Sequence, residues 1–259
     1  MPYSFDHQWQ HERQRLAALE AAADPWTVHN FLQLRVQPGW RCLEVGGGGG
    51  SIAEWLANQV GPNGRVIATD LETKFLEAID ADNIEVRKHD IVQDPLESDA
   101  YDLIHARAVL DHIPDRDLVV ERLVTALKPG GWLTIEGGDF STVRAVAGGN
   151  PDAFEMGFAK MLRVGESLGM ESTYGRCLGE AFRHAGLVDV SSAGMVTEWG
   201  CGDALKLLYH MTFERLREPA IEAGVITGEA LDRLLDQMAA PSFRAISHAM
   251  FFARGRRRA

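Results

Sequence analysis

Apolar and helix-like segments alternate regularly between residues 41 and 137. Short runs rich in apolar and β-branched residues are typical of buried strands, whereas the longer segments between them have helical spacing. The predicted strands are Arg41–Val45, Arg65–Thr69, Ile84–Lys88, Tyr101–Ala106 and Trp132–Glu136, and the predicted helices are Ser51–Val60, Lys74–Ile79 and Asp115–Leu127. Strands that alternate with helices predict a parallel sheet that is covered on both faces.

The sequence outside this region predicts mainly helices. Residues 8–23 are charged and rich in alanine, and Asp24 followed by Pro25 is typical of an N-cap that opens a second helix, to about Val36. After Gly137 a loop-like stretch, 138–150, precedes a further series of elements. These are helices from Asn150, near 176–185, near 203–217 and near 228–239, and strands Leu187–Ser191 and Ala245–Ala253.

Together these elements predict an α/β fold: a Rossmann-like, doubly wound, mostly parallel seven-stranded sheet with N-terminal helices and a helical lid insertion. We expect an N-terminal helical segment at 1–40 and a main domain at 41–259, with the lid at about 140–172. The chain has 259 residues, which is long enough for one large α/β domain of this kind.

Charge and cysteine content narrow the class of partners. The formal net charge of −11 would repel a phosphate backbone, so we expect no nucleic-acid partner. Cys42, Cys177 and Cys201 are too widely spaced for a disulfide framework or a metal clip, and we expect no metal. No apolar run approaches the roughly 20 residues of a membrane span, and the N-terminus shows no secretory signal. We therefore expect a cytoplasmic protein, monomeric or homodimeric, without a membrane partner.

Five consecutive glycines, 46–50, separate the first predicted strand from the helix that starts at Ser51. Each glycine in regular structure costs about 0.5–1 kcal/mol relative to alanine, and a turn alone requires only one or two. A bare backbone that ends at the electropositive start of a helix allows a ligand to approach closely. The loop therefore predicts a ligand site rather than a purely structural turn.

Acidic residues follow the next two predicted strands at the same edge of the sheet. Asp70 closes the second strand, twenty residues after Gly50, which is the spacing of a carboxylate that binds both hydroxyls of a ribose. Asp90 and Ile91 follow the third strand, where a carboxylate can accept a hydrogen bond from an exocyclic amine and the next backbone N–H can bind a ring nitrogen. Either acid alone is typical of a helix N-cap, but with the glycine loop they predict a nucleoside pocket.

The glycine spacing and Glu44 favour a cofactor that has no phosphate. A dinucleotide site expects G-x-G-x-x-G, and here the third small position falls on Ser51 or Ile52, whereas the loop fits G-x-G-x-G. The Glu44 carboxylate would repel a pyrophosphate and could attract a cationic amino group. No Gly-Lys-Ser/Thr follows, which excludes a P-loop. S-adenosylmethionine, with a ribose, an adenine, an ammonium and a sulfonium, fits this combination.

With these motifs the chain resembles the class I S-adenosylmethionine-dependent methyltransferases, and among them the small-molecule group that includes quinone, sugar and natural-product enzymes of bacteria. The motifs that carry the resemblance are Leu43–Gly50, Ala68–Asp70, His89–Ile91, Tyr101–Arg107 and Leu127–Leu133. The resemblance implies a transferase of the EC 2.1.1 class that uses S-adenosyl-L-methionine to methylate a small-molecule acceptor.

The resemblance also implies which residues bind the cofactor. They are Glu44, Gly46, Gly48, Gly50, Asp70, Leu71, Asp90, Ile91, Ala106 and Arg107. The glycines and Glu44 would contact the methionine end, and the exit of the fourth strand would bind the amino group through its backbone. Asp70 would bind the ribose hydroxyls, and Leu71, Asp90 and Ile91 would contact the adenine.

The best candidate for a catalytic residue is His112, which follows the fourth strand close to where the methyl group should point. Its neutral imidazole could accept a proton from a hydroxyl near pH 7, and we expect O-methylation ahead of N- or C-methylation. Because alignment alone can supply an effective molarity of about 10⁵–10⁸ M, a dedicated base is optional. Alternatively, His112 buttresses the adjacent turn, and Asp111 either orients His112 or is solvated. His105 lies within a strand, which favours a structural role. Arg107 could hold Glu44 or an acidic acceptor, but a salt bridge of the scaffold is favoured.

Two other functions fit parts of the sequence. A nicotinamide-dependent oxidoreductase would place Gly or Ala at position 51 and carry a Tyr-x-x-x-Lys pair, and neither is present. A relative that binds S-adenosylmethionine without methylating is compatible with every motif above. The Ala-Arg-Ala-Val exit of the fourth strand and the lack of a Pro-Cys pair argue against methylation of nucleic-acid bases. Candidate residues that line the acceptor pocket are Trp9, Tyr174, Trp199, Tyr209, His210 and Phe213.

Overall fold

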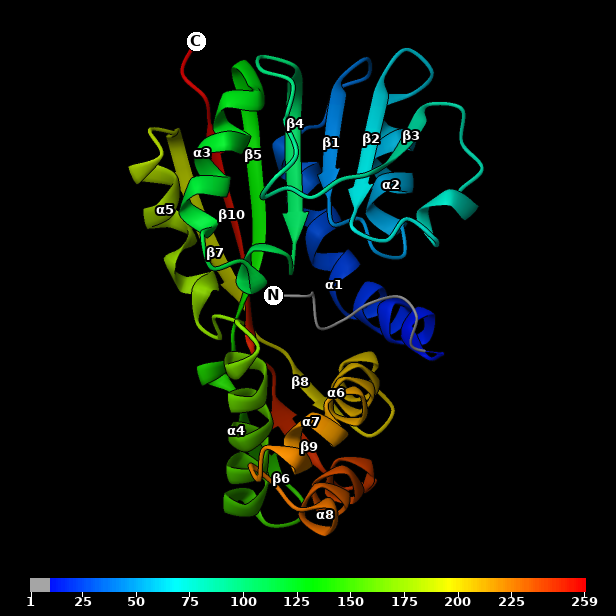
Figure 1. The fold of residues 1–259 in the computed structure, drawn as a ribbon, viewed down its shortest axis with the longest axis vertical. Coiled ribbons are helices and arrows are strands. Elements are labelled where there is room, and N and C mark those ends of the chain that lie inside the picture. Colours follow the sequence, from blue (N-terminus) through cyan, green and yellow to red (C-terminus); the bar gives the residue numbers. More distant parts are fainter. Residues whose placement is uncertain (1–9) are drawn as a thin grey trace.

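The structure, a computed structural model, describes residues 10–259. Figure 1 shows a large sheet flanked by helices and, beyond one edge of it, a smaller part that is mainly helical. The helices are α1 (Glu12–Leu34), α2 (Ser51–Val60), α3 (Arg116–Ala126), α4 (Pro151–Ser167), α5 (Leu178–His184), α6 (Ala204–Arg215), α7 (Arg217–Glu222) and α8 (Gly228–Ala239), with short 3₁₀ turns η1 (Leu76–Ala78), η2 (Leu110–His112), η3 (Phe140–Thr142) and η4 (Tyr174–Cys177). The strands are β1 (Arg41–Val45), β2 (Arg65–Asp70), β3 (Ile84–Lys88), β4 (Tyr101–Arg107), β5 (Leu127–Asp139), β6 (Arg144–Ala147), β7 (Val188–Met195), β8 (Glu198–Gly200), β9 (Arg244–Ile246) and β10 (Ala249–Arg256).

The large sheet has seven strands within residues 10–259, in the order β3-β2-β1-β4-β5-β10-β7. Strands β1 to β5 pair in parallel, and β10 is antiparallel to both β5 and β7. The predicted Rossmann-like, mostly parallel sheet is therefore confirmed. The winding reverses between β1 and β4, because β2 and β3 lie on one side of β1 and β5 lies beyond β4. In such sheets ligands bind at the carboxyl ends of the strands beside this reversal.

Side-chain alternation along the strands divides the core of the large sheet into two layers. On one face Leu43, Val45 and Ile104 pack with residues of α3 and α5. On the opposite face Cys42 and Leu103 pack with residues of α1 and α2. We call this second side the α1 face. Because successive strand residues point to opposite faces, Cys42 and Glu44 of β1 lie with Leu103 and His105 of β4 on the α1 face.

The smaller part has its own sheet and its own core. Its strands are arranged β6-β9-β8, and α4, α6, α7 and α8 pack around them (Figure 1). Aromatic side chains fill its centre, among them Phe154, Trp199, Tyr209 and Phe243. Residues of about 140–172, where a lid insertion is predicted, contribute β6 and α4, and residues 198–246 contribute the rest. Two separate stretches of chain thus share one apolar core.

Helix α1 is continuous, so the predicted break at Asp24-Pro25 is wrong. A proline inside a helix removes one hydrogen bond and costs about 3 kcal/mol. Tertiary contacts offset this cost, because Thr27, Phe31 and Leu34 of the following turns are buried. The Asp24 carboxylate does not cap a second helix and instead binds the side chains of Ser51 and Arg107.

Other differences from the predicted elements occur where segments are short. Within 74–79 only the 3₁₀ turn η1 forms, and 138–150 contains β6. The predicted last strand, 245–253, is divided between β9 of the small sheet and β10 of the large one. The division falls at Ser247, whose backbone N–H and side chain both bond Thr197. Within residues 10–259, no helix combines the length and apolar character that crossing a membrane requires.

Candidate active site

The glycine loop connects β1 to α2 at the carboxyl edge of the large sheet. Gly46, Gly48 and Gly50 have φ values of +67°, +54° and +97°, in the left-handed region that side chains disfavour. A Cβ atom on Gly46 would lie 2.3 Å from Val109 Cγ2, and one on Gly50 would lie 2.5 Å from Ile79 Cδ1. Conformation and space both exclude larger residues here, so the loop presents bare backbone.

Asp70 ends β2 directly beside this loop. Its Oδ2 accepts a hydrogen bond of 2.9 Å from the Gly48 N–H, and its Oδ1 accepts one of 3.1 Å from the Glu72 N–H. The structure therefore joins two of the predicted cofactor residues, which are 22 positions apart in the chain. The neighbouring Leu71 leaves 40% of its surface exposed, which provides an apolar face beside Asp70 for a flat ring.

Asp90 and Ile91 follow β3 in a tight turn. The Asp90 carboxylate accepts hydrogen bonds from the Val92 N–H at 2.9 Å and from Gln93 Nε2 at 3.0 Å. Ile91 is buried in the layer of core residues beneath α3. The turn is thus organised by Asp90 itself, and the Ile91 side chain belongs to the core, so a contact of Ile91 with a ligand would come from its backbone.

Glu44, His105 and Glu136 lie side by side on the α1 face of β1, β4 and β5. His105 Nδ1 is 2.7 Å from Glu44 Oε2, and His105 Nε2 is 3.1 Å from Glu136 Oε1. Burial of the three residues is nearly complete. Burial disfavours the imidazolium, but the charges and hydrogen bonds of the two carboxylates outweigh it and raise the pKa of His105 to about 9. The position of His105 within a predicted strand favours a structural role, and no sequence motif predicts a role for Glu136.

Arg107, at the end of β4, is bound to α1. Its guanidinium donates to Thr27 Oγ1 and to Asp24 Oδ1, both at 2.8 Å. Thr27 Oγ1 in turn donates to Glu136 Oε1 at 2.6 Å. These hydrogen bonds hold the Arg107 side chain against α1. Only the backbone at the end of β4 is therefore open to a ligand.

That strand exit has an unusual backbone. Ala106 is fully buried, and Ala108, two residues later, has a φ of +53°. Left-handed conformations cost an alanine about 1–2 kcal/mol, and such strain is concentrated at functional sites. The Ala108 N–H donates to the Glu136 carbonyl oxygen at 3.0 Å, which holds the strained turn in place.

The first half of α1 forms the outer wall of the glycine loop. A Cβ atom on Gly48 would lie 3.3 Å from Leu16 Cδ2, and one on Gly49 would lie 2.1 Å from Glu20 Oε1. Glu20 is paired with Arg13 at 3.0 Å. A ligand that binds this loop therefore contacts α1 as well as the sheet.

His112 lies in η2, close to the buried pair formed by Glu12 and Arg15 of α1. Burial, followed by the charges of Arg15 and Arg116, lowers the pKa of His112 to about 4, so its imidazole is neutral at physiological pH. The adjacent Asp111 does not sit in solvent as one alternative proposed. Its Oδ2 accepts from the Gly138 N–H at 3.0 Å, and burial raises its pKa to about 7.

Most aromatic residues proposed to line an acceptor pocket belong to the cores. Trp199, Tyr209 and Phe213 pack against one another in the smaller part, and Tyr174 is buried beneath the large sheet. Trp9 lies outside the described residues. A narrow cleft of about 30 Å³ does lie where α1 meets α6 and β10, lined by Trp26, His248 and apolar side chains.

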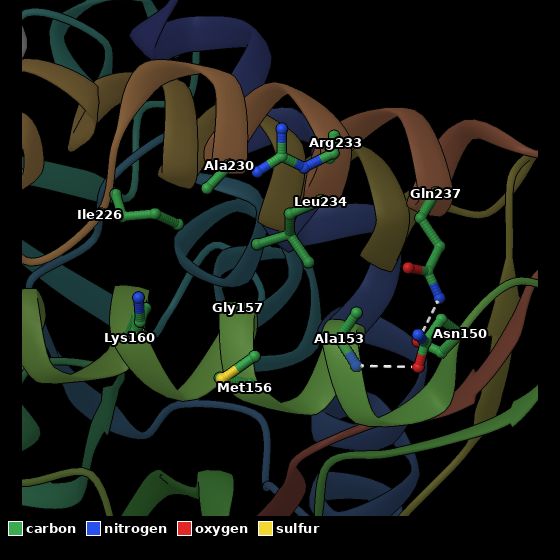
Figure 2. A pocket seen from close by; sticks show the side chains of 10 residues that line it. All are labelled: Asn150, Ala153, Met156, Gly157, Lys160, Ile226, Ala230, Arg233, Leu234 and Gln237. Carbon is green, nitrogen blue, oxygen red and sulfur yellow. Dashed lines mark hydrogen bonds between the residues drawn. The ribbon is translucent and has the colours of Figure 1, made fainter.

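A larger cavity of about 460 Å³ lies between α4 and α8 (Figure 2). Met156 and Leu234 contribute apolar walls, and Lys160 and Arg233 contribute positive charge. None of the predicted site residues lines it. It belongs to the smaller part, and neither the glycine loop nor the carboxylates of Glu44, Asp70 and Glu136 line it.

Comparison with known proteins identifies the part of the chain that contains the glycine loop. Residues 43–133 match the family model described as "Methyltransferase domain". This segment is similar to a methyltransferase domain, and the match agrees with the class I, S-adenosylmethionine-dependent type that the motifs indicate. The demethylmenaquinone methyltransferase of Lactobacillus johnsonii is 30% identical over 42% of this chain, and the trans-aconitate 2-methyltransferase of Variovorax paradoxus is 35% identical over 48% of it.

Solved structures extend the likeness of the methyltransferase fold over most of the chain. Phosphoethanolamine N-methyltransferase 2 of Haemonchus contortus, in complex with S-adenosyl-L-methionine, matches with a TM-score of 0.53 and 19% identity, over 95% of this chain and 52% of that one. A candidate methyltransferase of Bacillus halodurans matches with a TM-score of 0.58 and 18% identity, over 89% of this chain and 98% of that one. At such identities the likeness establishes the fold. The chain spans 48% and 51% of the length of the two curated relatives named above.

Proposed function

We propose that this protein is an S-adenosylmethionine-dependent methyltransferase that methylates an oxygen atom of a small-molecule acceptor. The observation that carries the proposal is the meeting of the bare glycine loop with Asp70, through the hydrogen bond from Gly48, beside the buried carboxylate of Glu44. An acid that faces this loop suits a cationic cofactor without phosphate and opposes a pyrophosphate. The methyltransferase match over residues 43–133 supports the same cofactor and speaks against the nicotinamide alternative.

The residues present fit S-adenosylmethionine. The loop offers a cradle that a Cβ atom would fill, and one Glu44 oxygen, Oε1, has no hydrogen-bond partner among residues 10–259. Glu44 would bind the ammonium group, Asp70 the ribose hydroxyls, and Leu71 one face of the adenine. Asp90 and the Ile91 backbone would bind the adenine edge. When bound, the cofactor supplies an activated methyl group on its sulfonium.

The chain's own contribution to the reaction is alignment and removal of a proton. The first half of α1 lies against Gly48 and Gly49 of the glycine loop. His112, neutral at physiological pH, would accept the hydroxyl proton of the acceptor as the oxygen is methylated. The net charge of −11 favours a small molecule over a nucleic acid.

Calorimetric titration with S-adenosylhomocysteine tests the nucleoside site. The wild type should bind, and Asp70→Ala and Asp90→Ala should each weaken binding by about tenfold or more, since each removes a charged hydrogen-bond acceptor. Asp152→Ala, which changes an exposed acid on α4, is the matched control and should bind as the wild type does.

Unchanged affinity in both site variants would refute the assignment of these two acids. Tight binding of NADH instead of S-adenosylhomocysteine by the wild type would restore the oxidoreductase alternative. Product detection by mass, with a panel of hydroxylated acceptors, separates a methyltransferase from a relative that binds the cofactor without transferring its methyl group.

A further inference from the structure

The Glu44–His105–Glu136 cluster has a geometry that strand register explains. Glu44 of β1 stands directly opposite His105 of β4, and Arg107 of β4 stands opposite Glu136 of β5. The His105 ring therefore lies between an acid level with it on one neighbouring strand and an acid two positions further on the other. Phe31 of α1 covers the ring edge to face, with centroids 5.0 Å apart.

The hydrogen bonds determine the protonation of the ring. Both nitrogens of His105 face carboxylate oxygens, at 2.7 Å and 3.1 Å. A neutral imidazole has a single N–H donor, whereas the imidazolium has two. Two ionised acceptors are satisfied together only by the charged ring. A single positive charge between two buried negative charges also reduces the cost of burying either carboxylate.

The carboxylates of Glu44 and Glu136 differ in the hydrogen-bond partners of their two oxygens. Glu136 Oε1 accepts from both His105 and Thr27, and Oε2 is buried without a hydrogen-bond partner in the described part of the chain. Glu44 is held by His105 through Oε2 alone, and its Oε1 has no partner within residues 10–259. Glu44, which adjoins the glycine loop, is thus fixed in orientation by one oxygen while the other is uncommitted.

We propose that His105 is a positioning residue of the cofactor site, which holds the Glu44 carboxylate in one orientation so that its second oxygen binds the ammonium group of the methionine end. This inference rests on the proposed function, since it assigns His105 a role toward the same cofactor. The chain Glu136–Thr27–Arg107–Asp24 continues from His105 to α1 and anchors the far side of the ring. His105 does not touch the cofactor in this account and acts through Glu44.

Two ligands separate this role from a purely structural one. S-adenosylhomocysteine carries the ammonium group, and 5′-methylthioadenosine lacks the whole amino-acid portion while keeping the adenosine. His105→Gln removes the donor at the Nδ1 position, and His105→Asn places an amide N–H close to that position. Calorimetry should show that His105→Gln loses about tenfold or more in affinity for S-adenosylhomocysteine and keeps its affinity for methylthioadenosine. His105→Asn should recover most of the lost affinity.

The other possible results of this titration separate failure of the positioning role from failure of the proposed function. Equal losses for both ligands, or no loss for either, in His105→Gln would overturn the positioning role. A wild type that binds neither ligand would instead overturn the proposed function. His184→Gln, which changes an exposed histidine on α5, is the matched control and should bind both ligands as the wild type does.

A measurement on the wild type keeps the proposal testable if His105→Gln does not fold. In ¹⁵N NMR at pH 7, the His105 ring should show two protonated nitrogens. Their signals should shift when S-adenosylhomocysteine is added and should stay unchanged with methylthioadenosine. A ring with one protonated nitrogen, or the same shift with both ligands, would contradict the inference.

Discussion

At the scale of single residues, neighbours decide the charge of His105 and of His112. His105, between two carboxylates, has its pKa raised to about 9, whereas burial and nearby cations lower the pKa of His112 to about 4. The same type of side chain is therefore an ion-pair partner on β4 and a neutral imidazole in η2. Only the second can accept a proton at neutral pH.

His112→Ala should leave the affinity for S-adenosylhomocysteine within about twofold and lower turnover by about 10²–10⁴-fold, the usual contribution of a general base. Turnover should be measured with an acceptor identified by its gain of a methyl group. In the wild type, protonation of His112 should affect turnover only near and below pH 4 to 5, because its pKa is about 4. His184→Ala provides the control, and full turnover in His112→Ala would remove His112 from the reaction.

At the scale of elements, α1 joins the sheet to the glycine loop. Its first half lies over Gly48 and Gly49, and its middle is bound to β4 and β5 through Thr27. The Thr27 hydroxyl donates to Glu136 and accepts from Arg107, so one side chain links a buried carboxylate to a cation. Loss of this hydroxyl would leave two charged groups short of a partner, which costs more than the loss of a hydrogen bond in water.

Thr27→Val, which keeps the shape of the side chain, should lower the free energy of unfolding by about 2 kcal/mol. Urea denaturation followed by circular dichroism measures the change. Thr125→Val is the matched control, because that hydroxyl is exposed and bonds only its own helix, and it should change the free energy by less than about 0.5 kcal/mol. Equal effects of the two substitutions would show that α1 is not held by the Thr27 hydroxyl.

At the scale of the whole molecule, the buried charges should make stability depend on pH. The folded-state pKa of His105, about 9, lies above its ordinary value of 6.5. Its contribution to stability is therefore fully present below pH 6.5 and is lost as the pH rises through 9. His248, whose pKa burial lowers to about 4, has the opposite effect, because its contribution is present above pH 6.5 and is lost as the pH falls through 4.

Urea denaturation between pH 6.5 and 9.5 should show a fall of up to about 3 kcal/mol in the free energy of unfolding, because folding raises the pKa of His105 from 6.5 to about 9. The fall should be much smaller in His105→Asn, which cannot titrate at this position. His184→Gln should keep the slope of the wild type. A wild-type stability that is flat across this range would show that His105 is not charged in the folded protein.

Much of the fold follows from local pattern. The bounds of β1, β3, α2 and α8 agree with the predicted ones, because alternation, capping and glycine loops act over a few residues. The predictions failed where tertiary contacts outweighed local preference. α1 continues through Pro25 because its buried side chains offset the lost hydrogen bond, and residues 245–253 divide between two sheets because each half pairs with a different neighbour.

The sequence by itself determined that the glycine loop and the acids that follow β2 and β3 lie at one edge of the sheet, because parallel strands end at a shared edge. Only the tertiary structure decided the partners of the remaining charges. Glu44, His105 and Glu136 are separated by 61 and 31 positions, and β1, β4 and β5 bring them together through strand order and register. Local sequence carries no information on that pairing, because hydrogen bonds between distant strands form only when the whole sheet is assembled.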